Sequence, residues 1–136
     1  MNIIYKRNCV YQIAYHVVWC VKYRRVVLKK GIAIRTKELI DNICAENSWE
    51  LISQEIQPDH IHLFITIPPS VSISTAIKKL KGITARKLFL EFRSLKKKLS
   101  NGSLWSPSYY VGTAGNVTAK TIKKYIERTE HKKNRR

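Results

Sequence analysis

Apolar and polar residues alternate along the chain between residues 9 and 21. Tyr15, Val17 and Trp19 fall on one side of this segment, whereas His16 falls on the other. Alternation with many aromatic and β-branched residues is typical of a β-strand. The pattern therefore predicts one long strand over residues 9–21, followed by a basic run where the strand ends.

The next three segments predict a helix and a hairpin. Residues 31–47 carry isoleucine and leucine near helical spacing, which predicts an amphipathic helix. Residues 49–57 and 60–67 have the composition of strands, and a Pro-Asp turn separates them. Because the connection is so short, the two strands are expected to pair antiparallel. A pair of prolines ends the second strand.

The C-terminal half of the chain predicts two more helices. Ser72 is suited to cap a long helix that runs to residue 99, with a bend or break expected at Gly82. Residues 106–116 predict a short strand or an extended loop, and residues 118–133 predict a last helix.

The order of these elements is βαββα(β)α, which predicts an α+β fold. It corresponds to a split βαβ arrangement of the ferredoxin-like or RRM-like kind, an antiparallel sheet with helices on one face. A C-terminal helix follows the sheet. We expect a single domain over residues 1–136, with a basic tail at about 131–136.

Charge narrows the choice of partners. The chain has 26 Lys and Arg against 9 Asp and Glu, a net charge of +17. Such a charge favours a polyanionic partner, and nucleic acid is a better candidate than a membrane surface, since the basic segments lack a spare apolar face. No apolar run approaches the roughly 20 residues of a membrane span, and no signal peptide is evident, so a cytoplasmic protein of the prokaryotic cytosol or nucleoid is expected. The three cysteines form no paired motif and are expected to be reduced thiols.

The basic residues gather in two places. Residues 78–98 contain nine basic residues and one acid, and a second patch follows the first strand. Charge this dense favours contact with phosphates, although part of it can be an ordinary solvated face. Tyr109 and Tyr110 can stack on exposed bases or belong to the core. The candidate nucleic-acid-binding residues are Lys22, Arg24, Arg25, Lys78, Lys79, Lys81, Arg86 and Lys87.

His60 and His62 are the candidate metal ligands. Side chains two residues apart on a strand share a face and lie about 6.5 Å apart along it. Two imidazoles at this spacing can converge on one divalent metal ion. The alternative is a pair of sheet histidines that hydrogen-bond to their neighbours, and the spacing alone does not decide between the two. His16, on another strand, is expected to have a structural role.

Tyr125 is the candidate nucleophile. On the last helix it falls on one stripe with Ile122, Ile126 and Thr129, so it is expected to face the sheet. A phenol has an ordinary pKa of about 10 and is a poor nucleophile at neutral pH. Beside a divalent cation that holds a phosphodiester, its hydroxyl can attack the phosphorus and form a phosphotyrosine. The alternative is a half-buried tyrosine with a satisfied hydroxyl.

Four stretches together resemble a known family over nearly the whole chain. They resemble the small HUH-superfamily transposases, insertion-sequence and REP-associated enzymes that act on single-stranded DNA with one catalytic tyrosine. The set in this order is more specific than any one motif. The stretches are YHVVWCVKYRR (15–25), PDHIHLFITIPPSVSIS (58–74), LKGITARKLF (80–89) and YYVGTAGNVTAKTIKKYIERTE (109–130).

The resemblance implies a mechanism and partners. His60 and His62 match the pair that holds Mg²⁺ or Mn²⁺, and Tyr125 matches the nucleophile that cuts one strand. The cut leaves a 5′-phosphotyrosine and a 3′ hydroxyl, and the 3′ hydroxyl of another end then joins the strands without ATP. Family members are homodimers with shared active sites that recognise imperfect hairpins near the ends of the element.

One position departs from the family pattern. The family usually has a glutamine four residues after the tyrosine as a third metal ligand, and here that residue is Thr129. Glu130 is a better ligand for a hard cation, but on an ideal helix it is rotated about 140° from Tyr125. Glu127 projects roughly opposite to Tyr125. Glu130 and Thr129 are both candidates, with Glu130 slightly favoured.

Two other functions fit the same features. The fold and charge would suit a non-catalytic module that binds single-stranded nucleic acid, without any role for Tyr125. A domesticated relative that acts on repeated host hairpins would use the same chemistry with no element to mobilise.

Overall fold

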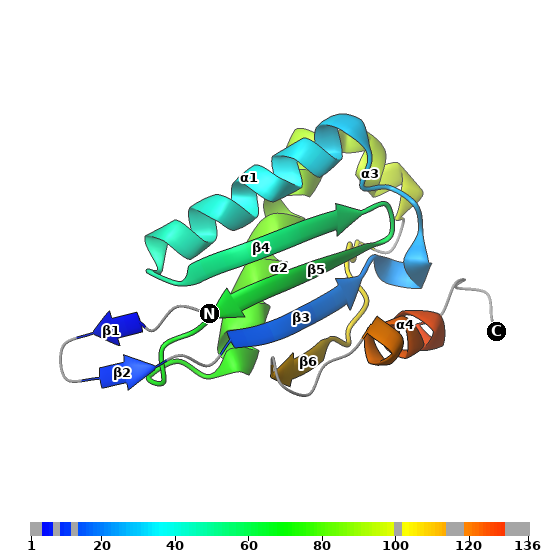
Figure 1. Cartoon of the computed structure of the whole chain (residues 1–136). Helices are drawn as coiled ribbons and strands as arrows, with labels where there is room; N and C mark the ends of the chain where they lie inside the picture. Colours follow the sequence, from blue (N-terminus) through cyan, green and yellow to red (C-terminus); the bar gives the residue numbers. More distant parts are fainter. Residues whose placement is uncertain (1–3, 7–8, 12–13, 100–101, 114–118, 130–136) are drawn as a thin grey trace.

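The fold is α+β, as the order of elements predicts. The computed structural model describes residues 4–6, 9–11, 14–99, 102–113 and 119–129. A four-stranded antiparallel sheet has the order β4-β5-β3-β6, and a separate hairpin pairs β1 with β2 (Figure 1). The strands are β1 (Ile4–Lys6), β2 (Cys9–Tyr11), β3 (Ala14–Cys20), β4 (Glu50–Gln57), β5 (His60–Thr66) and β6 (Tyr110–Thr113). The helices are η1 (Lys22–Arg24), α1 (Lys30–Glu46), α2 (Ile73–Glu91), α3 (Arg93–Lys98) and α4 (Ala119–Arg128).

The central hairpin and the helix cap agree with the sequence. β4 and β5 pair antiparallel around the Pro-Asp turn, with an irregularity between Leu51 and Ser53. Ser72 caps α2, because its side chain accepts a hydrogen bond from the backbone N–H of Thr75 at 3.1 Å. The segment left open as strand or loop contains β6, which pairs with β3.

The single long strand predicted over residues 9–21 is wrong. β2 pairs with β1 in a separate hairpin, β3 begins at Ala14, and residues 12–13 lie outside the described residues. The main ladder begins where Ala14 pairs with Thr66, close to the Pro-Pro pair that follows β5. Proline has no N–H to donate, so β5 cannot extend to support a longer β3.

The break expected at Gly82 is also wrong. α2 continues through Gly82 as one helix and ends at Glu91, and the next residue, Phe92, has an extended backbone with φ −127° and ψ 92°. Phe92 packs against the hydrophobic core, and α3 starts directly after it. The break therefore coincides with a residue that is packed against the core, ten positions after the predicted one.

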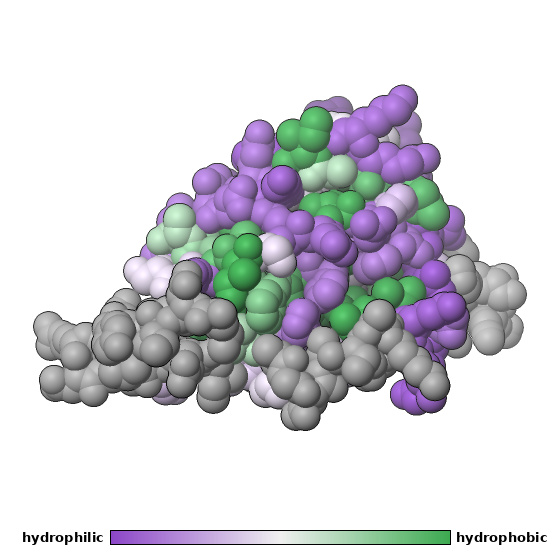
Figure 2. All heavy atoms as spheres, viewed as in Figure 1, coloured by the Kyte–Doolittle hydropathy of each residue, from purple (hydrophilic) through white to green (hydrophobic). Residues whose placement is uncertain are grey.

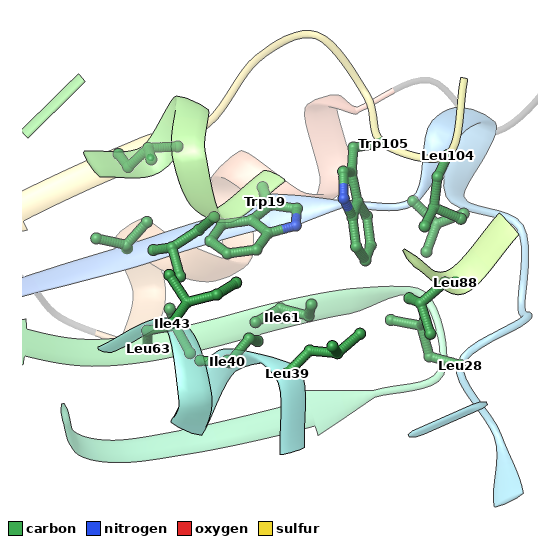
Figure 3. Packing of buried hydrophobic residues seen from close by; sticks show 14 of the residues in the cluster. Trp19, Leu28, Leu39, Ile40, Ile43, Ile61, Leu63, Leu88, Leu104 and Trp105 are labelled. Carbon is green, nitrogen blue, oxygen red and sulfur yellow. The ribbon is translucent and has the colours of Figure 1, made fainter. Parts of the chain in front are cut away.

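The hydrophobic core lies on one face of the sheet. Val17 and Trp19 of β3 and Ile61 of β5 are fully buried there, against apolar residues of α1 and α2. Figure 3 shows the rings of Trp19 and Trp105 meeting edge to face, with centroids 5.8 Å apart. This face is the helix-covered side that the split βαβ pattern predicts.

The opposite face of the sheet carries the polar residues. Alternation along β3 and β5 places the histidines of these strands on that side, and α4 lies against it. In Figure 1, α4 lies near β3 and β6, apart from α1. Figure 2 shows hydrophilic residues over much of the surface seen from this direction. Among the described helices, none has the length and apolarity of a membrane span.

Candidate active site at the histidine face

His60 and His62 share the polar face of β5, as their spacing predicts. His60 pairs with Cys20 and His62 with Val18 across the β3–β5 ladder, so both imidazoles lie over the two central strands, at the end of the ladder next to the β4–β5 turn. Their side chains are partly exposed, at 19% and 23%. The strand below them stays apolar on its other side, which fixes the direction of both rings.

Asp59 orients the ring of His60. The Nδ1 atom of His60 lies 2.8 Å from a carboxylate oxygen of Asp59, and Arg24 donates to the other oxygen at 3.2 Å. Burial alone would raise the pKa of Asp59, but the contacts with His60 and Arg24 lower it overall. A charged carboxylate requires the proton of His60 to be on Nδ1, which leaves the lone pair of Nε2 for a metal ion.

His16 adds a third imidazole to this face. Its Nδ1 atom lies 2.9 Å from Nε2 of His62, and its ring stacks on Phe64 with centroids 4.4 Å apart. Burial lowers the pKa of His62, and the neighbouring His16 lowers it further. Burial also lowers the pKa of His16. Both rings are therefore neutral at neutral pH, the form that a metal ligand needs.

A cleft of about 590 Å³ opens over these histidines. Its other wall is a side of α4, including Glu127. Two imidazole nitrogens suit a divalent cation, but no three His, Cys, Asp or Glu side chains among the described residues are placed to hold one together. The lining residues are His16, Arg24, Glu55, His60, His62, Ile122, Lys123, Ile126 and Glu127.

Of the two candidates for the third ligand, only Thr129 is among the described residues, and it does not line this cleft. The hydroxyl of Thr129 donates to the backbone carbonyl of Tyr125 at 3.2 Å, and Thr129 also contacts Cys20. It lines a different pocket, beside Lys22 and Ser108. Glu130 lies outside the described residues, as does the tail 131–136.

Tyr125 faces the sheet but lies away from the histidines. Its hydroxyl lies 3.1 Å from Oγ of Ser108, and its ring lies beside that of Tyr110, with centroids 6.1 Å apart. Burial raises the pKa of Tyr125, and the hydrogen bond with Ser108 offsets only part of this effect. In this arrangement the hydroxyl is protonated and does not line the histidine cleft.

The candidate DNA-binding residues have two kinds of environment. Five make contacts within the chain or are partly buried. Arg24 pairs with Asp59, and Lys22 lies over the Tyr23 ring. Lys79 donates to Asn47, Lys81 donates to the carbonyls of Ser106 and Ser108, and Nε of Arg25 is buried. The other three, Lys78, Arg86 and Lys87, are exposed on α2. Of the two tyrosines, Tyr109 is exposed and Tyr110 packs near Tyr125.

Sequence reasoning missed three residues of this site. Asp59 directly precedes His60, but its place in a turn hid its role as a hydrogen-bond partner. His16 reaches His62 only through the register of β3 against β5. Ser108 lies in a loop without a motif, and nothing in the sequence links it to Tyr125.

Comparison with known proteins identifies the family of this chain. The family described as "Transposase IS200 like" matches residues 9–129. The ISDra2 transposase TnpA of Deinococcus radiodurans is 43% identical over 127 residues, covering 93% of this chain and 90% of that protein. The transposase for insertion sequence element IS200 of Salmonella typhimurium is 34% identical over 113 residues, covering 83% of this chain and 74% of that protein.

Solved structures agree with the fold. A crystal structure assigned to a transposase from Deinococcus radiodurans superposes with a TM-score of 0.88 at 36% identity, covering 95% of this chain and 99% of that one. A REP-associated tyrosine transposase bound to a REP hairpin superposes with a TM-score of 0.54 at 14% identity, covering 93% of this chain and 69% of that one. The second likeness concerns the fold alone.

The chain belongs to the IS200-like transposases. It is therefore a DNA-binding protein of DNA transposition, an enzyme that cleaves and transfers DNA strands.

Proposed function

We propose that this transposase binds hairpins in single-stranded DNA at the ends of an insertion sequence, and cleaves and rejoins one strand through Tyr125. The observation that carries the proposal is the pair His60 and His62 on one face of β5, with His60 oriented by Asp59, next to the helix that bears Tyr125. The net charge of +17 suits a DNA partner. The proposal treats residues 1–136 as one domain that works in the cytoplasm.

The ligands of the proposed metal are His60 and His62, with Glu130 or Thr129 as the further ligand. A bound Mg²⁺ or Mn²⁺ would polarise the phosphate that is to be cut. His60 contributes its Nε2 lone pair, because Asp59 holds the proton on Nδ1. Arg24 keeps Asp59 charged and in place.

In the proposed cleavage, the oxygen of Tyr125 forms a bond to phosphorus and loses its proton. The bond from phosphorus to the 3′ oxygen breaks, and that oxygen leaves with a proton as a 3′ hydroxyl. In the joining step, the 3′ hydroxyl of another end attacks the phosphotyrosine and restores the tyrosine. Each step exchanges one phosphate ester for another, so neither step needs ATP.

We propose a homodimer with shared active sites. Within the described part of one chain, Tyr125 bonds to Ser108 and lines no part of the histidine cleft, which supports a site completed by the second subunit or by movement of α4. DNA hairpins are the proposed substrate, since the family acts on insertion-sequence ends and one fold neighbour holds a REP hairpin.

A denaturing-gel assay tests the proposal. The protein is mixed with labelled single-stranded DNA from the flanks of its own gene, in Mg²⁺ or in EDTA. We expect a protease-sensitive covalent adduct in Mg²⁺ only, with the attached nucleotide on Tyr125 by mass spectrometry. Tight, salt-sensitive binding without any adduct would contradict the proposal and favour a non-catalytic binding module. An adduct formed on host repeat hairpins alone would indicate a domesticated relative.

A further inference from the structure

A second hollow lies between α2 and the segment 102–109. It has a volume of about 560 Å³ and shares no lining residue with the histidine cleft. We call it the α2 groove. Trp105 and Ile77 are buried beneath it, whereas Tyr109 stays exposed. Its lining residues are Ser74, Thr75, Ile77, Lys78, Lys81, Gly82, Ala85, Gly102, Ser103, Leu104, Trp105, Pro107 and Tyr109.

Gly82 lies inside α2 and lines this groove. Glycine is less stable than alanine in a helix interior, because it loses more backbone freedom. No packing explains its presence, since a Cβ atom built at Gly82 meets no atom within 4 Å. Its backbone does not require glycine either, because Gly102 is the one described glycine with a positive φ. A methyl group fits at this position, but a larger side chain would extend into the open space of the groove.

The groove is positively charged and has one aromatic wall. Lys78 is exposed and pairs with no acid among the described residues, and no Asp or Glu lines the groove. Lys81 links α2 to the segment 102–109, which forms the opposite wall of the groove. Its ammonium donates to the carbonyls of Ser106 and Ser108 at 2.8 and 3.2 Å. The same ammonium lies 5.9 Å from the centre of the Tyr109 ring. Tyr109 is therefore held beside an open, cationic space.

We propose that the α2 groove binds an unpaired nucleobase of the DNA substrate. The base would stack on Tyr109, and the adjoining phosphate would lie at Lys78. Aromatic stacking next to a cation is a general means of holding single-stranded nucleic acid. The hydroxyls of Thr75 and Ser103 can bond to the edge of the base. The net charge of +17 favours this occupant over a protein. The inference rests on the proposed function only in taking single-stranded DNA as the substrate.

The test fills the groove without disturbing the helix. In Gly82→Leu, a good helix former projects a large side chain into the groove, and Gly82→Ala adds only a methyl group. Ser94→Leu is the matched control, because Ser94 is exposed on α3 and does not line the groove. Tyr109→Ala removes the stacking surface. Dissociation constants for a fluorescent hairpin with single-stranded flanks are measured at one fixed salt concentration, beside thermal unfolding of each variant.

We expect Tyr109→Ala to weaken binding by about 5- to 150-fold, the range found when a stacking aromatic is removed. Gly82→Leu should weaken binding to a similar degree and unfold no lower than wild type. Gly82→Ala and Ser94→Leu should bind within about 2-fold of wild type.

A scan with one abasic nucleotide at each position locates the base. The wild-type protein should bind less tightly to the DNA that lacks the base at one particular position. The Gly82→Leu protein should bind this abasic DNA as well as it binds the intact DNA, because its groove is already filled. Equal losses in wild type and Gly82→Leu would overturn the inference, as would wild-type affinity in Gly82→Leu. If either of these results is found while the protein still forms the covalent adduct, the groove inference is wrong and the proposed function stands. If wild type binds no DNA, the proposed function fails as well.

Discussion

The hydroxyl oxygen of Tyr125 lies 3.1 Å from Oγ of Ser108, whereas the cleft of His60 and His62 is lined by other residues of α4. Burial of the ring raises the pKa of Tyr125 and keeps the phenol protonated, because the bond with Ser108 offsets only part of this effect. If Tyr125 is the nucleophile that we propose, this arrangement is a resting one. Under the proposed function, Tyr125 must leave Ser108 before it can attack a phosphate held at a histidine pair.

Tyr125→Phe tests the nucleophile itself. We expect the variant to form no covalent adduct, because phenylalanine has no oxygen to bond to phosphorus, and to bind hairpin DNA within about 2-fold of wild type. Tyr110→Phe is the matched control, since its ring lies beside that of Tyr125 on the same face. A Tyr125→Phe protein that still forms an adduct would assign the reaction to another residue.

Asp59→Asn tests the orientation of His60. An amide cannot hold the Nδ1 proton as a carboxylate does, so binding of Mn²⁺ should weaken by about 10- to 100-fold, the usual effect of losing such a partner. Isothermal titration with Mn²⁺ measures this directly, apart from any activity. Asp41→Asn is the control, because Asp41 is an exposed carboxylate bonded to Gln54. Unchanged Mn²⁺ affinity in Asp59→Asn would remove Asp59 from this role.

The histidine face predicts a dependence of stability on pH. Burial lowers the pKa of His16 and of His62 below the unfolded value of 6.5. The unfolded chain then binds more protons, so the stability due to the neutral rings is fully present above pH 6.5 and is lost as the pH falls through the lowered values.

Urea unfolding in EDTA at several pH values between 5 and 8 measures this effect. We expect the free energy of unfolding to decrease below about pH 6.5, and the His16→Gln, His62→Gln double variant to decrease less. If the free energy of unfolding decreases equally with pH in wild type and in the double variant, other groups cause the acid sensitivity.

Lys81 and Lys87 should behave differently although both are basic residues of α2. Lys81→Met loses two hydrogen bonds to carbonyls of the segment 106–108, so we expect the free energy of unfolding to fall by about 1–3 kcal/mol. Lys87→Met removes an exposed cation and should leave stability within about 0.5 kcal/mol. Lys87→Met should instead reduce the salt dependence of DNA binding. Chemical denaturation and binding at several salt concentrations check both, and equal stability of the two variants would contradict the structural role of Lys81.

Local patterns in the sequence were enough to predict most of the fold. Alternation placed His60 and His62 on one face of β5, and Ser72 was recognised as a cap because its partner lies three residues away. The failures concern long-range packing. The extent of β3 depends on where its partner β5 ends, and α2 ends where Phe92, which packs against the core, leaves the helical conformation.

The candidate site could be predicted only in part, for the same reason. The 2.9 Å contact between His16 and His62 joins residues 46 positions apart, and it depends on the register of two strands. The spacing of residues along the sequence does not predict how two strands are aligned with each other. The bond from Ser108 to Tyr125 depends on how α4 docks on the sheet, which no pattern within α4 specifies.

Ser108→Ala tests whether the resting arrangement restrains the reaction. Loss of one hydrogen bond, worth about 0.5–1.5 kcal/mol, should release Tyr125 and raise the rate of adduct formation by about 2- to 10-fold. Single-turnover cleavage at saturating protein measures this rate without a contribution from binding. Ser108→Thr keeps a hydroxyl at the same position and should react at the wild-type rate. A slower Ser108→Ala protein would mean that Ser108 assists the attack, since a restraint can only be relieved by its removal.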